Sequence, residues 1–246
     1  MATDKKVALV TGANRGIGFE TARQLGQKGV TVVVAARTLK SAEETAAKLK
    51  TEGVDAFPVK LDVTNTQDRE AAARTIGDKF GKLDILINNA GVGSQDGMFN
   101  PKTINTTEDE LQTVFGTNLF GTIAVTRSLL PLHKKSDAGR IVNLSSILGS
   151  LALHADPNSP IASVKTFAYD ASKTALNAFT IHLAAELKDT NIKVNSAHPG
   201  WVKTEMGTDA APMEIPEGAK TSVDLALLGP DGPNGRFIHL GQELPW

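Results

Sequence analysis

The sequence of 246 residues contains no cysteine, one tyrosine and no long apolar run. The lack of cysteine excludes disulfides and thiolate metal ligands. No run approaches the roughly 20 apolar residues of a membrane span, and no signal-peptide pattern is seen near the first residue. The net charge of −1 indicates no surface for nucleic acid or anionic membrane. The five histidines lack metal-ligand spacing, so we expect no metal site. We also expect the protein to be cytoplasmic.

Short apolar runs alternate with amphipathic segments along the whole chain. Nearly continuous apolar runs are typical of strands buried on both faces of a parallel sheet, and they occur at 5–11, 31–36, 55–63, 83–90, 140–146, 191–199 and, more weakly, 236–240. Helical patterns lie at 16–28, 41–52, 67–80, about 106–130, 167–188 and about 216–228. The alternation predicts an α/β fold. We expect one doubly wound, Rossmann-type domain over 1–246, with a mostly parallel seven-stranded sheet flanked by helices.

Two segments are predicted as long loops that border a substrate. Residues 147–166 contain two prolines, and residues 203–217 contain two more prolines and two methionines. Long loops in compact domains often act as lids or binding loops.

A glycine-rich turn follows the first predicted strand. The stretch VALVTGANRGIG places Gly12, Gly16 and Gly18 between a strand and a helix. Glycines at this junction let backbone N–H groups approach a pyrophosphate, and the helix N-terminus favours the negative charge. Glycines that only close a tight turn are the alternative, because the spacing GxxxGxG differs from the dinucleotide pattern GxGxxG.

The end of the second predicted strand indicates which dinucleotide would bind. NAD-binding folds usually have an acidic residue there for the ribose 2′-hydroxyl. This chain has VVVAARTLK, in which Arg37 is the first charged residue, and Arg15 lies in the glycine turn. A guanidinium group binds two oxygens of one phosphate at once. Arginines near the ribose therefore suit a 2′-phosphate, and the pattern favours NADP(H) over NAD. The alternative is that Arg37 begins a solvated helix face.

The single tyrosine lies in the stretch AYDASK, four residues before a lysine. On a helix, Tyr169 and Lys173 share a face. A phenol has a pKa near 10 in isolation, and a nearby ammonium favours the phenolate. We therefore expect Lys173 to lower the pKa of Tyr169 and to make it an acid–base group. A tyrosine that packs beside a solvated lysine is the ordinary reading of YxxxK alone.

The order of the motifs resembles the short-chain dehydrogenase/reductase family, and its carbonyl reductase branch in particular. The motifs TGANRGIG, LDV, NNAG, TNLFG, RIVNLSS, YDASK and PGWVKT span residues 11–204 in the order of that family. The resemblance implies NADPH-dependent reduction of a small ketone or aldehyde, and the reverse oxidation of an alcohol. The apolar candidates Leu148, Trp201, Met206 and Met213 suggest that this substrate is hydrophobic. It also implies hydride transfer by the cofactor, while the protein positions and polarises the substrate.

The resemblance also implies the site residues. The catalytic residues would be Asn118, which anchors a water relay, Ser146, which donates to the carbonyl oxygen, Tyr169, which supplies the proton, and Lys173. The cofactor would contact Gly12, Asn14, Arg15, Gly16, Ile17, Gly18, Arg37, Asp62, Val63, Asn89, Ala90, Gly91, Tyr169, Lys173, Pro199, Gly200, Trp201, Val202 and Thr204. The substrate would contact Ser146, Leu148, Tyr169, Trp201 and Met206.

The chain departs from the family pattern in one region. Ser146 and Tyr169 are separated by more residues than in most short members. An insertion on the helix that tetrameric relatives use as an interface leads us to expect a monomer or a weak dimer. Two alternatives remain, a non-catalytic NADP sensor and an epimerase or dehydratase of the same fold. The four catalytic residues named above are all present, which disfavours a non-catalytic sensor. Only 42 residues follow Thr204, which disfavours an epimerase or dehydratase.

Overall fold

The computed structural model describes residues 5–94 and 103–246. In this part of the chain, eight strands form one sheet in the order β3-β2-β1-β4-β5-β6-β7-β8. The strands are β1 (Val7–Val10), β2 (Thr31–Ala36), β3 (Ala56–Lys60), β4 (Ile85–Asn88), β5 (Arg140–Leu144), β6 (Lys193–Ala197), β7 (Phe237–His239) and β8 (Gln242–Glu243). The first seven are parallel, and β8 pairs antiparallel with β7.

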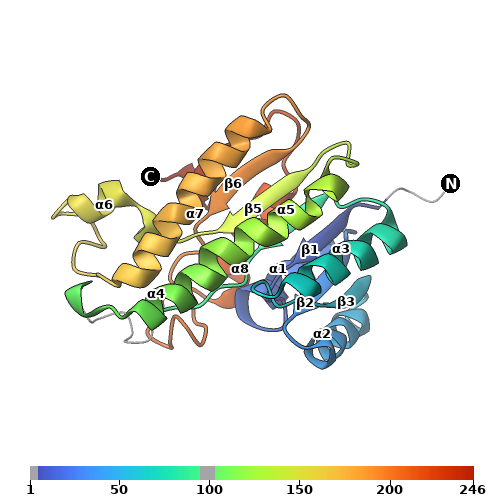
Figure 1. The fold of residues 1–246 in the computed structure, drawn as a ribbon, viewed down its shortest axis with the longest axis horizontal. Coiled ribbons are helices and arrows are strands. Elements are labelled where there is room, and N and C mark those ends of the chain that lie inside the picture. The colour runs from blue at the N-terminus through green and yellow to red at the C-terminus, as the bar shows by residue number, and fades with distance from the viewer. Residues whose placement is uncertain (1–4, 95–102) are drawn as a thin grey trace.

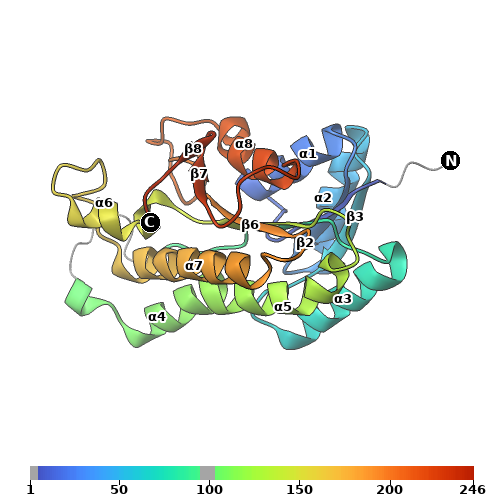
Figure 2. The ribbon, with the colours of Figure 1, turned by 90° about the horizontal axis from the view of Figure 1, so that it is seen from above.

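Helices cover both faces of this sheet (Figures 1 and 2). One face carries α1 (Gly16–Gln27), α2 (Leu39–Thr51) and α8 (Ile215–Ala226), and the other carries α3 (Thr66–Phe80), α4 (Glu108–Phe115), α5 (Thr122–His133) and α7 (Phe167–Glu186). Side chains of β1 alternate between the two layers, since Leu9 packs with one buried cluster and Val10 with the other. This alternation is what two-sided burial of a strand requires.

The predicted α/β class, the doubly wound topology and the mostly parallel sheet are confirmed. The predicted number of strands is wrong by one, because β8 adds to the seven expected. Two further differences concern helices. The predicted helix at 106–130 is divided into α4, a π-helical segment at Gly116–Gly121 and α5, which ends at His133. The predicted loop 147–166 contains a 3-10 turn at Ile147–Gly149 and the short helix α6 (Leu151–Ala155).

A buried polar network joins the central strands to α7. Asn88 on β4 donates to Asn143 Oδ1 on β5 at 2.8 Å, and Asn143 donates to Thr180 Oγ1 on α7 at 2.9 Å. Ser196 on β6 donates to the same Thr180 oxygen at 2.9 Å. Since each of these side chains is fully or almost fully buried, the network fixes α7 along the sheet.

No helix in the described ranges combines the length and the apolar character that spanning a bilayer requires.

The C-terminal end of α5 contains a buried histidine, His133, with no exposed surface. Neither ring nitrogen has a hydrogen-bond partner in the described part of the chain. Burial lowers the pKa of His133 to about 4, against an opposing effect of the Asp84 charge. The folded protein therefore holds this imidazole neutral at pH values where the unfolded chain protonates it.

We expect this difference to destabilise the protein in mild acid. An ordinary histidine titrates near pH 6.5, so below that pH the unfolded state binds a proton that the folded state refuses, until about pH 4. The free energy of unfolding should fall by about 2 kcal/mol from pH 7 to pH 5 through this residue. His133→Leu should remove that part of the pH dependence in urea denaturation. His182→Leu, at an exposed position of α7, is the control, and an equal effect of both variants would contradict the prediction.

Candidate functional site

A cleft of about 1030 Å³ lies at the carboxyl ends of the parallel strands. The sheet order reverses between β1 and β4, and doubly wound folds bind ligands at such a point. Segments that follow β1, β2, β3, β4, β5 and β6 all contribute to the lining, and α7 adds Tyr169 and Lys173. The fold thus brings together residues that are up to 200 positions apart.

Most of the predicted site residues line this cleft. Those that do are Gly12, Asn14, Arg15, Gly16, Ile17, Gly18, Arg37, Asp62, Val63, Asn89, Ala90, Gly91, Tyr169, Lys173, Pro199, Thr204 and Met206. The others lie outside its lining: Asn118, Ser146, Leu148, Gly200, Trp201 and Val202. Trp201 is 41% exposed and donates from Nε1 to the Gly207 carbonyl at 2.8 Å, whereas Leu148 is buried.

The glycine turn is held by side chains from the end of β4. Asn89 Nδ2 donates to the carbonyl oxygens of Thr11 at 2.8 Å and Gly12 at 3.1 Å. A Cβ on Gly18 would lie 2.4 Å from both Asn89 Nδ2 and the Gly12 oxygen. Gly12 itself has a φ of 61°, which glycine adopts at little cost. Glycine is therefore required at Gly18 by the close approach of Asn89, and at Gly12 by the backbone conformation.

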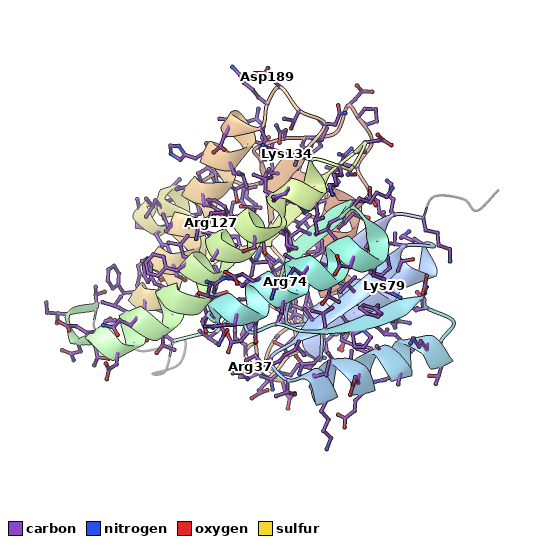
Figure 3. All side chains as sticks on the ribbon, turned by 45° about the vertical axis from the view of Figure 1, so that its right-hand side comes forward. Arg37, Arg74, Lys79, Arg127, Lys134 and Asp189 are labelled. Atoms are coloured by element: carbon purple, nitrogen blue, oxygen red, sulfur yellow. The ribbon has the colours of Figure 1, made fainter. Side chains whose placement is uncertain are left out.

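Two arginines border the cleft in different ways. Arg37 is exposed just after β2 (Figure 3). The Arg15 guanidinium forms an ion pair with Glu205, which follows Thr204 in the segment after β6. Both side chains of this pair line the cleft, so the pair bridges its two sides. Sequence reasoning did not identify Glu205, because nothing local connects two residues 190 positions apart.

Asn118 lies in the π-helical segment and is almost fully buried. Its Oδ1 accepts from the Val92 N–H at 2.8 Å, and its Nδ2 donates to the Val92 carbonyl at 2.9 Å and to Ser172 Oγ at 3.0 Å. The side chain thus ties the segment after β4 to α7. π-helical turns occur frequently at functional sites because they redirect one residue out of the helix ladder.

Tyr169 and Lys173 lie on the first two turns of α7. The Ser146 side chain lies close enough to the Tyr169 hydroxyl to act on its pKa. Ser146 Oγ also accepts from the Leu148 N–H at 3.2 Å. Lys173 Nζ donates to the Leu144 carbonyl at 2.8 Å and lies 5.5 Å from the centre of the Tyr169 ring. The ammonium therefore lies beside the Tyr169 ring.

The pKa of Tyr169 differs from the sequence-based expectation. Burial raises it to about 12, the Ser146 hydrogen bond opposes that shift, and the Asp170 charge adds to it. Burial also lowers the pKa of Lys173 to about 8. The expected lowering of the tyrosine pKa by Lys173 is therefore wrong for this structure, because burial of the phenol raises its pKa and only the Ser146 side chain opposes the rise. At neutral pH the phenol carries its proton, which is the form that can donate.

A buried histidine supports the segment that carries Ser146. His198 Nδ1 accepts from the Ile147 N–H at 3.2 Å and from the Gly200 N–H at 3.4 Å. Burial lowers the pKa of His198 to about 3, and His239 adds to the effect. The imidazole is therefore neutral and keeps its lone pair for these amides. No local pattern in the sequence indicates these partners.

Further residues line the cleft that sequence reasoning did not select. They include Val92, Thr117, Ser145, Lys203, Thr208 and Asp209. Most of them lie in or directly beside a predicted motif, and this position in the sequence was the only indication that they would line the cleft. Among the described residues, no group of three or more His, Asp or Glu side chains is arranged to hold a metal ion.

Comparisons with known proteins show which sequences and structures this chain is similar to. The family model for short chain dehydrogenase matches residues 6–215. Carbonyl reductase (NADPH) 1 of Mus musculus is 32% identical, with all of both chains covered. A 3-oxoacyl-(acyl-carrier-protein) reductase of Staphylococcus aureus is 34% identical over 92% of this chain and 86% of its own. The crystal structure of NADPH-bound carbonyl reductase from chicken fatty liver has a TM-score of 0.86 at 28% identity, and 98% and 99% of the chains are covered.

The single tyrosine allows its pKa to be measured directly. The ultraviolet absorbance of phenolate reports Tyr169 alone, since the chain has no other tyrosine. We expect a midpoint near pH 12 in the folded protein, and near pH 10 after unfolding in guanidinium. At pH 11 about one-tenth of the folded protein should carry phenolate, with circular dichroism as the check on folding. A folded midpoint at or below that of the unfolded chain would refute the effect of burial.

Proposed function

The chain belongs to the short-chain dehydrogenase family, and from this premise we propose that it is an oxidoreductase that transfers hydride from NADPH to the carbonyl of a small, hydrophobic ketone or aldehyde. One observation carries the proposal: Tyr169 and Lys173 lie together on α7 in the cleft that contains the glycine turn, and Ser146 lies beside Tyr169. The likeness to an NADPH carbonyl reductase over the whole chain supports the same reaction class.

The cleft suits a dinucleotide in size and in backbone chemistry. Its volume of about 1030 Å³ is at the upper end for small-molecule sites. The N-terminus of α1 has no side-chain cap, so its first N–H groups are available to a pyrophosphate. A Cβ on Gly91 would lie 3.4 Å from Asn118 Oδ1 and 3.7 Å from Lys173 Nζ, so glycine keeps the space beside these groups open. We propose that the cleft-lining residues predicted above hold the cofactor.

NADPH, when bound, supplies the hydride. The residues of the chain would then stabilise the negative charge that develops on the carbonyl oxygen. Ser146 would donate one hydrogen bond to that oxygen, since the Leu148 N–H binds a lone pair of its Oγ and leaves the hydroxyl hydrogen free to donate. Tyr169, protonated at neutral pH, would donate the proton. Lys173 would hold a ribose hydroxyl and would return a proton to Tyr169, with Asn118 as the anchor of the relay.

The proposed substrate class rests on apolar side chains at one end of the molecule. Exposed apolar residues follow β5 and β6, namely Leu151 at 63%, Phe167 at 45%, Trp201 at 41% and Met206 at 49% exposure. The helices that begin at Leu151 and Phe167 lie together at that end in both views (Figures 1 and 2). Exposed apolar groups beside a reaction site favour an apolar substrate. The predicted monomer or weak dimer and the cytoplasmic location belong to the proposal and rest on the sequence alone.

Replacement of the proposed acid tests the reaction. Tyr169→Phe should fold and bind NADPH as the wild type does, while kcat for reduction of an aryl ketone falls by roughly 10²–10⁴, the usual contribution of a general acid. Circular dichroism and NADPH fluorescence are the controls. A variant with near-normal kcat would exclude Tyr169 as the acid. A wild type that binds NADPH but reduces no ketone, aldehyde or quinone would instead support the sensor alternative.

The arginine after β2 should determine the choice of cofactor. Each charge-assisted hydrogen bond to a 2′-phosphate contributes roughly 1.5–3 kcal/mol, so the wild type should prefer NADPH over NADH at least about tenfold in kcat/KM. Arg37→Asp should lose most of this preference, because a carboxylate repels the phosphate. Added salt should reduce the preference of the wild type.

Arg74→Asp is the matched control for Arg37→Asp. Arg74 is an exposed arginine on α3, outside the cleft lining, and the variant makes the same change in net charge (Figure 3). Its cofactor preference should equal that of the wild type. The NADP(H) assignment fails if the wild type uses both cofactors equally, and the role of Arg37 fails if both arginine variants behave alike.

A further inference from the structure

The sheet opens on the cleft side where β5 and β6 end. In the described part of the chain, the last backbone bond between these strands runs from the Ser145 N–H to the Ala197 carbonyl at 2.8 Å. Beyond it, β5 leads into the turn that carries Ser146, and β6 leads into the turn that carries Pro199 and Gly200. Ser145 and Pro199 line the cleft. Strand pairing does not reach these two turns, so their relative position depends on side chains.

His198 is the side chain that connects the two turns. Its backbone is fixed to β7, since its N–H donates to the Ile238 carbonyl at 2.8 Å and its own carbonyl lies 2.9 Å from His239 Nδ1. A carbonyl only accepts, so His239 Nδ1 carries the hydrogen. His198 is 7% exposed, and its ring packs on that of His239 with centres 4.7 Å apart. The imidazole of His198 thus extends from a fixed backbone and is packed in place.

One ring nitrogen of His198 serves both turns. Nδ1 lies 3.2 Å from the Ile147 nitrogen and 3.4 Å from the Gly200 nitrogen, and both amides donate to it. Two donors require a lone pair on Nδ1, so the neutral ring carries its hydrogen on Nε2. Burial lowers the pKa of His198 to about 3, so the acceptor persists at neutral pH. Because Ile147 follows Ser146 and Gly200 follows Pro199, a single atom relates the serine to the cleft-lining proline.

The turn after β6 is held on another side by Met213. The Met213 N–H donates to the Trp201 carbonyl at 3.2 Å, and the Met213 carbonyl accepts from the Lys203 N–H at 2.9 Å. Gly200 has a φ of 89°, and a Cβ there would overlap Met213 Sδ. Loss of the His198 imidazole would therefore leave this turn attached to Met213 and would release it only from the turn that carries the serine.

We propose that His198 is a positioning residue for the reaction, which aligns Ser146 with the cofactor by holding the two turns on one acceptor atom. This inference rests on the proposed function. His198 lies outside the cleft lining, so it acts through the amides of Ile147 and Gly200 rather than by contact with a ligand. Ser146 would bind the carbonyl oxygen, while the cofactor beside the other turn supplies hydride to the carbonyl carbon. A misplacement of about 1 Å between such groups costs roughly 10²-fold in rate.

Three substitutions of His198 test the alignment. His198→Leu removes the acceptor, and we expect kcat for an aryl ketone to fall about 30-fold or more. The affinity for NADPH should change less than about threefold, because the glycine turn and Arg37 keep their places. His198→Asn places Oδ1 as many bonds from Cβ as Nδ1 and should bring kcat back to within about fivefold of the wild type. His198→Gln places its acceptor one bond farther away and should not restore kcat.

His133→Leu is the matched control. His133 is also a buried histidine, but its ring has no hydrogen-bond partner among the described residues and it lies outside the cleft lining. The same substitution there should leave kcat within about twofold of the wild type. An equal loss of kcat in the two leucine variants, or equal activities of the Asn and Gln variants, would overturn the role of His198. If His198→Leu does not fold, His198→Gln takes its place, and a near-normal kcat in it would overturn the role too.

Nitrogen NMR tests the same arrangement without turnover. In the wild type at neutral pH, His198 should show a non-protonated Nδ1 and a protonated Nε2. Added NADPH should shift the Ile147 amide signal, because the cofactor moves the Gly200 amide and the shared acceptor transmits the change. This shift should persist in His198→Asn and should fall by at least about half in His198→Leu. A wild type that binds NADPH but reduces no ketone defeats the proposed function alone, whereas an Ile147 shift that is unchanged in His198→Leu defeats this inference alone.

Discussion

The hydrogen bond from Asn143 to Thr180 is the contact on which the site depends most. It joins the middle of the sheet to α7, the helix that carries Tyr169 and Lys173. Asn88 and Ser196 extend the contact to the neighbouring strands. A buried amide that lost its partner would cost the full desolvation penalty of that group, so α7 has one favourable position along the sheet. That position sets how far Tyr169 and Lys173 lie from the turns that follow β4 and β5.

The edges of the cleft are held by side chains whose hydrogen bonds go to backbone groups. Asn89 holds the glycine turn, Asn118 holds the segment at Val92, and His198 holds the amides of Ile147 and Gly200. Turns at the end of a sheet have backbone groups that no strand partner satisfies. Side chains that complete those bonds leave each turn with one conformation. The cleft is thereby prepared for a ligand that binds mainly through the backbone.

Burial favours the neutral form of both Tyr169 and Lys173 on α7. The pKa of Tyr169 rises to about 12 and that of Lys173 falls to about 8, so the neutral form of each group is favoured. The lysine ammonium donates to one carbonyl oxygen, and the phenol lies beside the Ser146 side chain. At neutral pH the phenol therefore keeps its proton, close to the point of the proposed reaction.

The sequence by itself determined the α/β class, the parallel sheet, the glycine turn and the shared helix face of Tyr169 and Lys173, because each follows from a periodicity or spacing within a few residues. It did not determine β8, which is too short and polar to have a pattern, nor α6, whose five residues form a helix because Ser150 caps it and Trp246 binds it. The π-helical turn around Asn118 lies within a continuous helical pattern and was equally hidden. Only the tertiary structure decided that Arg15 pairs with Glu205 and that burial raises the pKa of Tyr169. Ion pairs and desolvation depend on groups that are distant in the chain, and local sequence patterns contain no information about them. The roles of the individual site residues remain predictions that the variants above test.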